Sequence, residues 1–518
     1  MKHQIWKAGL IMAALIAIAG SVAFAAAGAT APTKEEPKAA APAPAPAKPA
    51  APAPPPHEEL FWPEAWKALH NPTPWLSMGL DHRFRIEAGE RWTTLNRDVA
   101  SDNQYMYERY RTRWWTKWTV NEDVSFNTRL VWEFRTWQEP EAKRQFVNPP
   151  GSENPFVTEF NPDEALFDWF NLNLRNIGDM PLTATIGRQD IIFGVGWLVL
   201  DATPLDGSRT IGGFDAARFT YDWADTNTKV DAIYVHETAH STDLFKPIGD
   251  ENRGITEQDE NAAILYLTNT AWKPVQLEGF FIYRNDNPVD ELLSNFPAIW
   301  SQKAEIYTFG AAVAGTQGEH WKYRAEGAIQ RGDKHDATPV PGTVGPSRDL
   351  ESYGTLNTLE YLFKDPHENA THLTYEYASG DDPDTKENEQ FDLLWGEWPR
   401  WSELLIYTYS NETRVADSTN LHRINIGHRL SLNKQWTVTL DYHALWADQN
   451  TGATSPSKIA LSSTDKFRGS LLTTWWRYKF SDQLYGHFLA EYFFPGNYYV
   501  EPSHDTAYFL RFNVEYIF

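Results

Sequence analysis

The stretch from Tyr105 to Val120, YMYERYRTRWWTKWTV, places the strongest constraint on what this chain can fold into. As a β-strand it directs successive side chains to opposite faces, so that three arginines and Lys117 share one face while Trp114 and Trp118 share the other. A water-soluble sheet would have to bury the aromatic face. A closed barrel in lipid instead turns the aromatic face outward and lines a water-filled lumen with the basic face. A solvated edge strand is the alternative for a single stretch of this kind.

The same period of two recurs from Trp75 to the last residue, which favours the barrel over an isolated edge strand. The links between the alternating segments differ in length. Polar stretches of some length separate short links at residues 121–122, 178–180, 224–228, 273–274, 433–434 and 481–482. Short periplasmic turns and long external loops are typical of outer-membrane barrels.

The predicted number of strands depends on residues 401–410. If this stretch is a strand, the total is odd and the short link at residues 433–434 falls on the external side. If it belongs to an external loop or a short hairpin, every short link falls on one side. We therefore predict an all-β fold, a transmembrane antiparallel β-barrel of about 18 strands, spanning residues 74–518.

The two ends of the chain predict an outer-membrane location. Residues 1–25 have a basic start, an apolar run and a final Ala-Phe-Ala, the pattern of a secretory signal peptide, with an uncleaved anchor as the alternative. Residues 26–73 are rich in Ala and Pro and predict a disordered periplasmic segment with a short helix near its end. The last strand alternates up to Phe518, and this terminal aromatic resembles the insertion signal of bacterial outer-membrane barrels.

Composition excludes several classes of function. Aromatic residues make up 14% of the chain and the formal net charge is −23, so we expect outer-membrane lipid and no nucleic acid among its partners. The absence of cysteine excludes disulfides, thiolate metal sites and cysteine nucleophiles.

One enzyme motif matches by letter. Residues 236–240 read H-E-T-A-H, but the zinc chemistry of this motif needs a helix, and a strand-like segment precedes it here. We predict a chance match in a strand end or loop. Residues 381–384 hold three aspartates that suit calcium, although a solvated acidic loop is the favoured interpretation. We therefore predict no enzyme activity, catalytic residues, metal or cofactor, and keep a barrel enzyme or a surface adhesion module as less favoured alternatives.

Two stretches are more specific than the barrel pattern. In the first, residues 186–219, Gly187-Arg188-Gln189 ends one predicted strand and Phe214-Asp215 begins the next. The second, residues 378–395, reads ASGDDPDTKENEQFDLLW. Together they resemble the alginate export family of outer-membrane porins, in which a G-R-Q segment precedes R-x-x-x-x-F-D, and a later S-G-D loop leads to F-D-x-L.

The resemblance covers about residues 75–518 and implies an arginine-rich conduit for an anionic polysaccharide. The positions that match the first motif are Arg188, Arg209, Asp215 and Arg218. The glycine-then-basic step that often follows G-R-Q reads G-V-G-W at residues 194–197, so a basic residue expected there is missing.

Arginines on the alternating segments supply the chemistry that such a conduit needs. Guanidinium groups replace the hydration of a carboxylate with charge-assisted, often bidentate hydrogen bonds, and several moderate sites conduct better than one deep site. The predicted conduit residues of the first three strands are Arg83, Arg85, Arg109, Arg111, Arg113, Arg129 and Arg135. Asp81, Glu87 and Glu133 share these faces, so a salt-bridge lattice that braces the lumen is the alternative.

The expected function is passage of an alginate-like polyuronate through the lumen. A general or substrate-specific porin for small anions is the alternative. The expected partners are accordingly an anionic polysaccharide or small anions, together with a periplasmic scaffold beside an exporter.

Overall fold

The computed structural model describes residues 68–99, 104–139, 164–201, 213–240, 246–249, 254–290, 301–336, 343–396, 398–412, 417–450 and 459–518. All of them belong to one compact unit, Glu64–Phe518. The predicted signal peptide, most of the Ala/Pro-rich segment and Arg209 lie outside the described residues and stay predictions.

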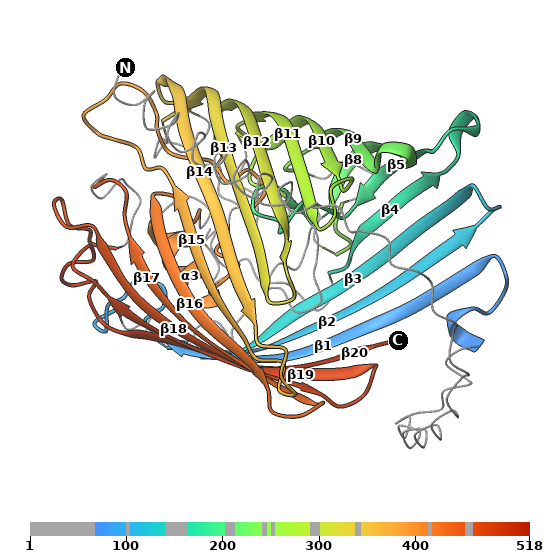
Figure 1. Ribbon diagram of the computed structural model, residues 1–518. Coiled ribbons are helices and arrows are strands. Elements are labelled where there is room, and N and C mark those ends of the chain that lie inside the picture. The colour runs from blue at the N-terminus through green and yellow to red at the C-terminus, as the bar shows by residue number, and fades with distance from the viewer. Residues whose placement is uncertain are drawn as a thin grey trace, which may run out of the picture. The chain divides into compact units, whose positions relative to one another are not determined.

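The described chain forms a closed antiparallel barrel, an 18-stranded sheet in which each strand pairs with its neighbours along the chain and β1 also pairs with β20 (Figure 1). The predicted fold is therefore confirmed. The strands are β1 Leu76–Glu90, β2 Gln104–Thr119, β3 Val124–Glu139, β4 Leu166–Leu174, β5 Leu182–Gln189, β8 Phe214–Trp223, β9 Thr228–Glu237, β10 Asp259–Asn269, β11 Val275–Asn287, β12 Ala304–Gln317, β13 Trp321–His335, β14 Ser347–Leu362, β15 Ala370–Ala378, β16 Leu421–Ser431, β17 Trp436–Trp446, β18 Phe467–Lys479, β19 Leu484–Pro495 and β20 Ala507–Ile517.

Side chains alternate across the barrel wall as the pattern of residues 105–120 predicts. On β2, Trp114 is 50% exposed and Trp118 is 41% exposed, whereas Arg111 is fully buried. The exposed aromatic side chains form the outer face, which meets lipid, and the arginines lie on the inner face.

The short connections all lie at one end of the barrel, which confirms their predicted common side. They include the 3-10 turns η3 (Ile177–Asp179) and η4 (Ala224–Thr226). Asparagine side chains stabilise two others, because Asn121 Oδ1 accepts a hydrogen bond from the Asp123 amide and Asn433 Oδ1 accepts one from the Gln435 amide.

Residues 401–410 form no strand and belong to the long connection between β15 and β16, which agrees with the 18-strand prediction. The sequence did not predict that most of them form a helix, α3 (Glu403–Glu412). Ser402 caps this helix, since its Oγ accepts a hydrogen bond from the Leu405 amide at 3.1 Å. Leu404, Leu405 and Tyr409 are buried on one side of it. Within the described ranges, no helix has the length and apolar character needed to cross a membrane.

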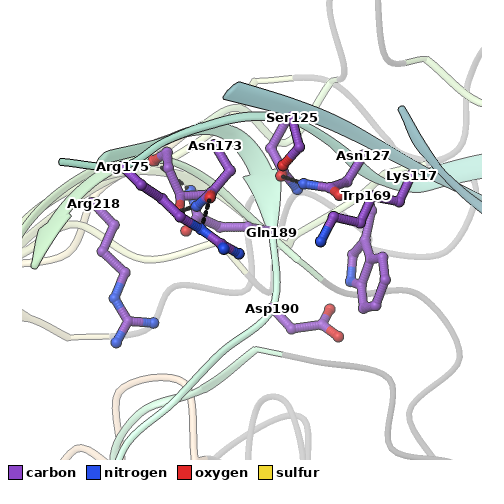
Figure 2. A pocket seen from close by; sticks show the side chains of 11 residues that line it. Lys117, Ser125, Asn127, Trp169, Asn173, Arg175, Gln189, Asp190 and Arg218 are labelled. Atoms are coloured by element: carbon purple, nitrogen blue, oxygen red, sulfur yellow. Dashed lines mark hydrogen bonds between the residues drawn. The ribbon is translucent and has the colours of Figure 1, made fainter. Parts of the chain in front are cut away.

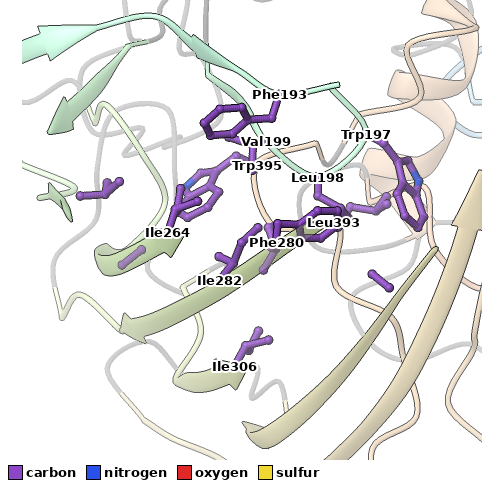
Figure 3. Packing of buried hydrophobic residues seen from close by; sticks show 14 of the residues in the cluster. Phe193, Trp197, Leu198, Val199, Ile264, Phe280, Ile282, Ile306, Leu393 and Trp395 are labelled. Atoms are coloured by element: carbon purple, nitrogen blue, oxygen red, sulfur yellow. The ribbon is translucent and has the colours of Figure 1, made fainter. Parts of the chain in front are cut away.

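The inner face of β10, β11 and β12 carries an apolar patch, which the strand pattern did not predict. Ile264, Phe280, Ile282 and Ile306 are buried there. They pack against the connection between β5 and β8, which contains the small hairpin of β6 (Ile191–Ile192) and β7 (Leu200–Asp201) (Figure 3). Because these strands bury apolar side chains on the inside and expose others to lipid, the alternation in this part of the sequence is weak.

Candidate functional site

The predicted arginines of β1 and β2 lie together on the inner wall. Arg83 is directly opposite Arg111, and Arg85 is directly opposite Arg109. On the other side of β2, Arg109 is opposite Arg135. The β20 strand adds Arg511, opposite Glu87 on β1.

Carboxylates bind these arginines in an ion-pair network. Arg113 Nε lies 2.8 Å from Asp81 Oδ1, and Arg111 Nη2 lies 3.5 Å from Glu515 Oε1. Arg109 pairs with Glu133. We call this network the arginine lattice, defined as Arg83, Arg85, Arg109, Arg111, Arg113 and Arg511 with Asp81, Glu87, Glu133 and Glu515.

Its members are at most 6% exposed, so the arginines are largely desolvated. Their ion pairs with carboxylates link neighbouring strands, as the salt-bridge alternative in the sequence analysis expects. Arg135, outside the lattice, lies 5.0 Å from the centre of the Tyr107 ring.

Arg129 and Arg218 belong to a second group, on β3 and β8. Arg129 makes a bidentate pair with Asp168, at 2.8 and 2.7 Å, and its guanidinium lies 3.8 Å from the centre of the Trp169 ring. It also lies 3.2 Å from Asp190. Arg218 pairs with Asp231 at 2.8 Å.

Arg188 and Asp215 bind each other. They are directly opposite on β5 and β8 and form a bidentate pair at 2.8 and 2.7 Å. By strand alternation they lie on the side of Ile186 and Phe219, which are exposed on the outer face. The pair braces two neighbouring strands on the outer face, so the structure does not bring these two predicted conduit residues to the lumen.

The two family-like stretches meet inside the barrel, which their positions in the sequence do not reveal. Phe214 of the first makes an edge contact with Trp395 of the second, with ring centres 5.0 Å apart. Phe391 stacks on Trp197 at 5.5 Å, and Trp395 Nε1 donates a hydrogen bond to Glu260 at 2.7 Å. Two connections, β5 to β8 and β15 to β16, are thereby held against the inner wall.

Asp392 is the charged anchor of this contact. It accepts hydrogen bonds from Arg284 at 3.0 Å and from Lys334 at 2.8 Å. Burial opposes its ionisation, but the two cations outweigh burial and hold the pKa of Asp392 well below its ordinary value.

Helix α3 also packs on the inner wall, near the end of β1 away from the short turns. Glu403 pairs with Arg511 of the lattice at 2.8 Å, and Thr408 donates a hydrogen bond to the backbone oxygen of Trp92 at 2.7 Å. Glu491 on β19 accepts hydrogen bonds from the Ser402 hydroxyl and the Leu404 amide.

A polar pocket lies toward the short-turn end of the inner wall. This turn-side pocket has a volume of about 300 Å³ and is lined by Lys117, Ser125, Asn127, Trp169, Asn171, Asn173, Arg175, Thr185, Gln189, Asp190 and Arg218 (Figure 2). Burial raises the pKa of Asp190 to about 6, against the opposing charge of Arg129. The sequence placed Lys117 on the basic face but did not identify Arg175, which follows the end of β4.

The H-E-T-A-H motif lies at a strand end, as predicted. His236 and Glu237 end β9, so the two histidines do not share a helix face, and His236 Nδ1 lies 2.7 Å from Asn261 Oδ1. In the acidic loop, Asp381 pairs with Arg348 at 2.7 Å. The described part of the chain holds no cluster of three or more His, Cys, Asp or Glu residues suited to a metal ion.

Comparison with known proteins gives one family match. The sequence profile described as alginate export matches residues 74–510. No curated protein sequence matches the chain.

Solved outer-membrane structures resemble the barrel at low sequence identity. Pseudomonas aeruginosa OccK11 (OpdR) is 9% identical with a TM-score of 0.46, and the match covers 85% of this chain and 95% of that one. Acinetobacter baumannii OccAB1 is 10% identical with a TM-score of 0.49, over 85% and 96% of the two chains.

Proposed function

Because the chain belongs to the alginate export family, we propose that this outer-membrane channel passes an anionic polysaccharide of the polyuronate type through its lumen. The arginine lattice is the part of the inner wall that would act on such a polymer. Its guanidinium groups are buried and already paired with carboxylates, so they would act on the polymer through their positive potential and not by direct contact.

The observation that carries the proposal is the register of like charges in the lattice. A network built only to brace the wall would place opposite charges across from each other, because like charges directly opposite destabilise a sheet. Here arginine faces arginine in the pairs Arg83–Arg111 and Arg85–Arg109. The first pair lies between Glu515 and Glu133, but the row of the second pair continues to Arg135 on one side and Asn513 on the other and holds no carboxylate. This arrangement concentrates positive potential on one side of the lumen, which attracts and guides anions.

A porin for small anions is the second candidate. The observation in its favour is the narrowing of the lumen by α3 and by the two connections held against the inner wall. A narrow lumen with the same basic lattice suits single small acids as well as an extended polymer.

Conductance in planar lipid bilayers distinguishes these functions. We expect anion-selective current that a long polyuronate blocks in a dose-dependent way and that a neutral polysaccharide of equal length leaves unchanged. Cation selectivity would contradict both candidates. Anion selectivity with permeation of glucuronate, but without block by the polymer, would support the small-anion porin.

A further inference from the structure

We infer that the turn-side pocket is a subsite that binds a short stretch of polyuronate as it enters from the periplasm, with Lys117 and Arg175 each pairing with a sugar carboxylate. This inference rests on the proposed function and adds to it a place of first binding. The pocket borders the short turns, which face the periplasm in this barrel, so it lies where an exported chain would enter.

The cations of this pocket differ from those of the arginine lattice. Arg175 Nε donates a hydrogen bond to Asn173 Oδ1 at 3.1 Å, and no described carboxylate pairs with it. Lys117 likewise has no ion pair with any carboxylate in the described part of the chain, and its strand neighbours are Ser77 and Asn127. These two cations are therefore available to an external anion, whereas the arginines of the lattice are engaged by carboxylates.

The neutral lining suits a sugar. Asn127 and Asn173 carry amides that both donate and accept hydrogen bonds, and the Ser125 and Thr185 hydroxyls do the same. Sugar hydroxyls need partners of this mixed kind. In Figure 2 Lys117 lies beside Trp169, while Arg175 lies on the opposite side of the pocket, so the two cations flank the polar lining.

The pocket's size and openness suit a transient site. About 300 Å³ lies at the lower end of the range for small-ligand sites. Arg175 is exposed and Lys117 is partly exposed, so each remains partly hydrated and binds an anion moderately. Moderate binding at entry is what a conducting pathway needs, since a site that holds the polymer tightly would stop transport.

The test compares a double variant, Lys117→Gln with Arg175→Gln, against Lys229→Gln. Lys229 is a matched control because it lies near another short turn, lines no part of this pocket and is 4.0 Å from Asp231. The probe is a hexameric polyuronate added from the periplasmic side of a bilayer. We expect the half-blocking concentration to rise about tenfold or more in the double variant, as for the loss of two charge-assisted contacts, and to stay unchanged in the control.

Calorimetric binding of the same hexamer to the purified protein in detergent gives a second readout that does not depend on conduction. If the double variant loses this binding and the control keeps it, the subsite is supported. Failure of the hexamer to block current would count against the proposed function only, and would leave this support for the subsite in place. Equal block and equal binding in wild type and double variant would overturn the subsite and leave the proposed function standing. An equal effect of Lys229→Gln, or equal binding of a neutral hexamer, would also overturn it.

Discussion

Asp190 is the residue whose ionisation most directly changes the charge of the turn-side pocket. Burial raises its pKa to about 6, so it carries a negative charge at pH 7.5 and is mostly protonated at pH 5. Sugar carboxylates, with a pKa of about 3.5 by analogy with α-carboxyl groups, stay ionised over this range. We predict that block by the uronate hexamer strengthens severalfold as the pH falls from 7.5 to 5.

The change Asp190→Asn should remove most of this pH dependence and give strong block at both values. Asp179→Asn, in the exposed turn η3, is the control, and its block by the hexamer should depend on pH as in the wild type. The stability of the barrel should depend on pH in the same direction, and be greater at low pH. Because the pKa of folded Asp190 lies above its unfolded value, its ionisation destabilises the barrel as the pH rises through about 6. A pH dependence that persists in Asp190→Asn would assign the effect to another group.

Substitution of Asp392 tests whether its charged contacts hold the β15–β16 connection inside the barrel. The change Asp392→Ala leaves Arg284 and Lys334 buried without this partner, and breaking a buried pair costs roughly 3–5 kcal/mol. We predict that the connection detaches from the wall, so that single-channel conductance becomes larger and noisier while the barrel still inserts. Asp384→Ala, at an exposed position of the same connection, should conduct like the wild type.

At the scale of elements, the sequence predicts what depends on local pattern and misses what depends on distant contacts. The strands and the common side of the short turns follow from alternation and turn chemistry, which neighbouring residues determine. Helix α3 is stabilised in part by Glu491, on a strand far along the chain, which accepts hydrogen bonds from the start of the helix. No local feature of residues 401–410 reveals this partner.

The candidate site is predicted unevenly for the same physical reason. Alternation correctly placed Arg83 and Arg111 on one face, and Arg511 follows the same rule in the last strand. The contact between Phe214 and Trp395 joins segments far apart in sequence, so their motifs indicated a family without indicating that they meet.

Helix α3 is the element whose removal tests how the lumen is narrowed. Replacing residues 403–412 with a Gly/Ser linker removes the buried side chains of the helix and the Glu403 partner of Arg511, which keeps Glu87 at 2.5 Å. We predict a clear increase in single-channel conductance with normal membrane insertion. A linker in place of residues 382–386, in the more exposed part of the same connection, is the control. Unchanged conductance after removal of α3 would place the helix outside the ion path.

For the whole molecule, net charge and lumen charge are separate quantities. The chain carries a formal net charge of −23, yet the arginine lattice contains more arginines than carboxylates. Ions in a narrow lumen respond to the nearby wall, because charges beyond a Debye length of about 8 Å are largely screened at physiological salt. Selectivity should therefore follow the lattice and not the overall acidity of the chain.

The double change Arg111→Gln with Arg113→Gln tests this at the level of the whole channel. It removes two positive charges and leaves Glu515 and Asp81 without these partners, so the lattice keeps four arginines against four carboxylates and loses its excess of positive charge. We predict that the reversal potential in a salt gradient shifts toward cation selectivity while insertion is kept. The matched control neutralises both members of an inner-wall pair, Arg423→Gln with Glu376→Gln, which bind each other at 2.7 Å. Since this control leaves the net charge unchanged, its selectivity should match that of the wild type. If the Arg111/Arg113 variant inserts and keeps full anion selectivity, the lattice only braces the wall. If that variant fails to insert, these two arginines have a mainly structural role.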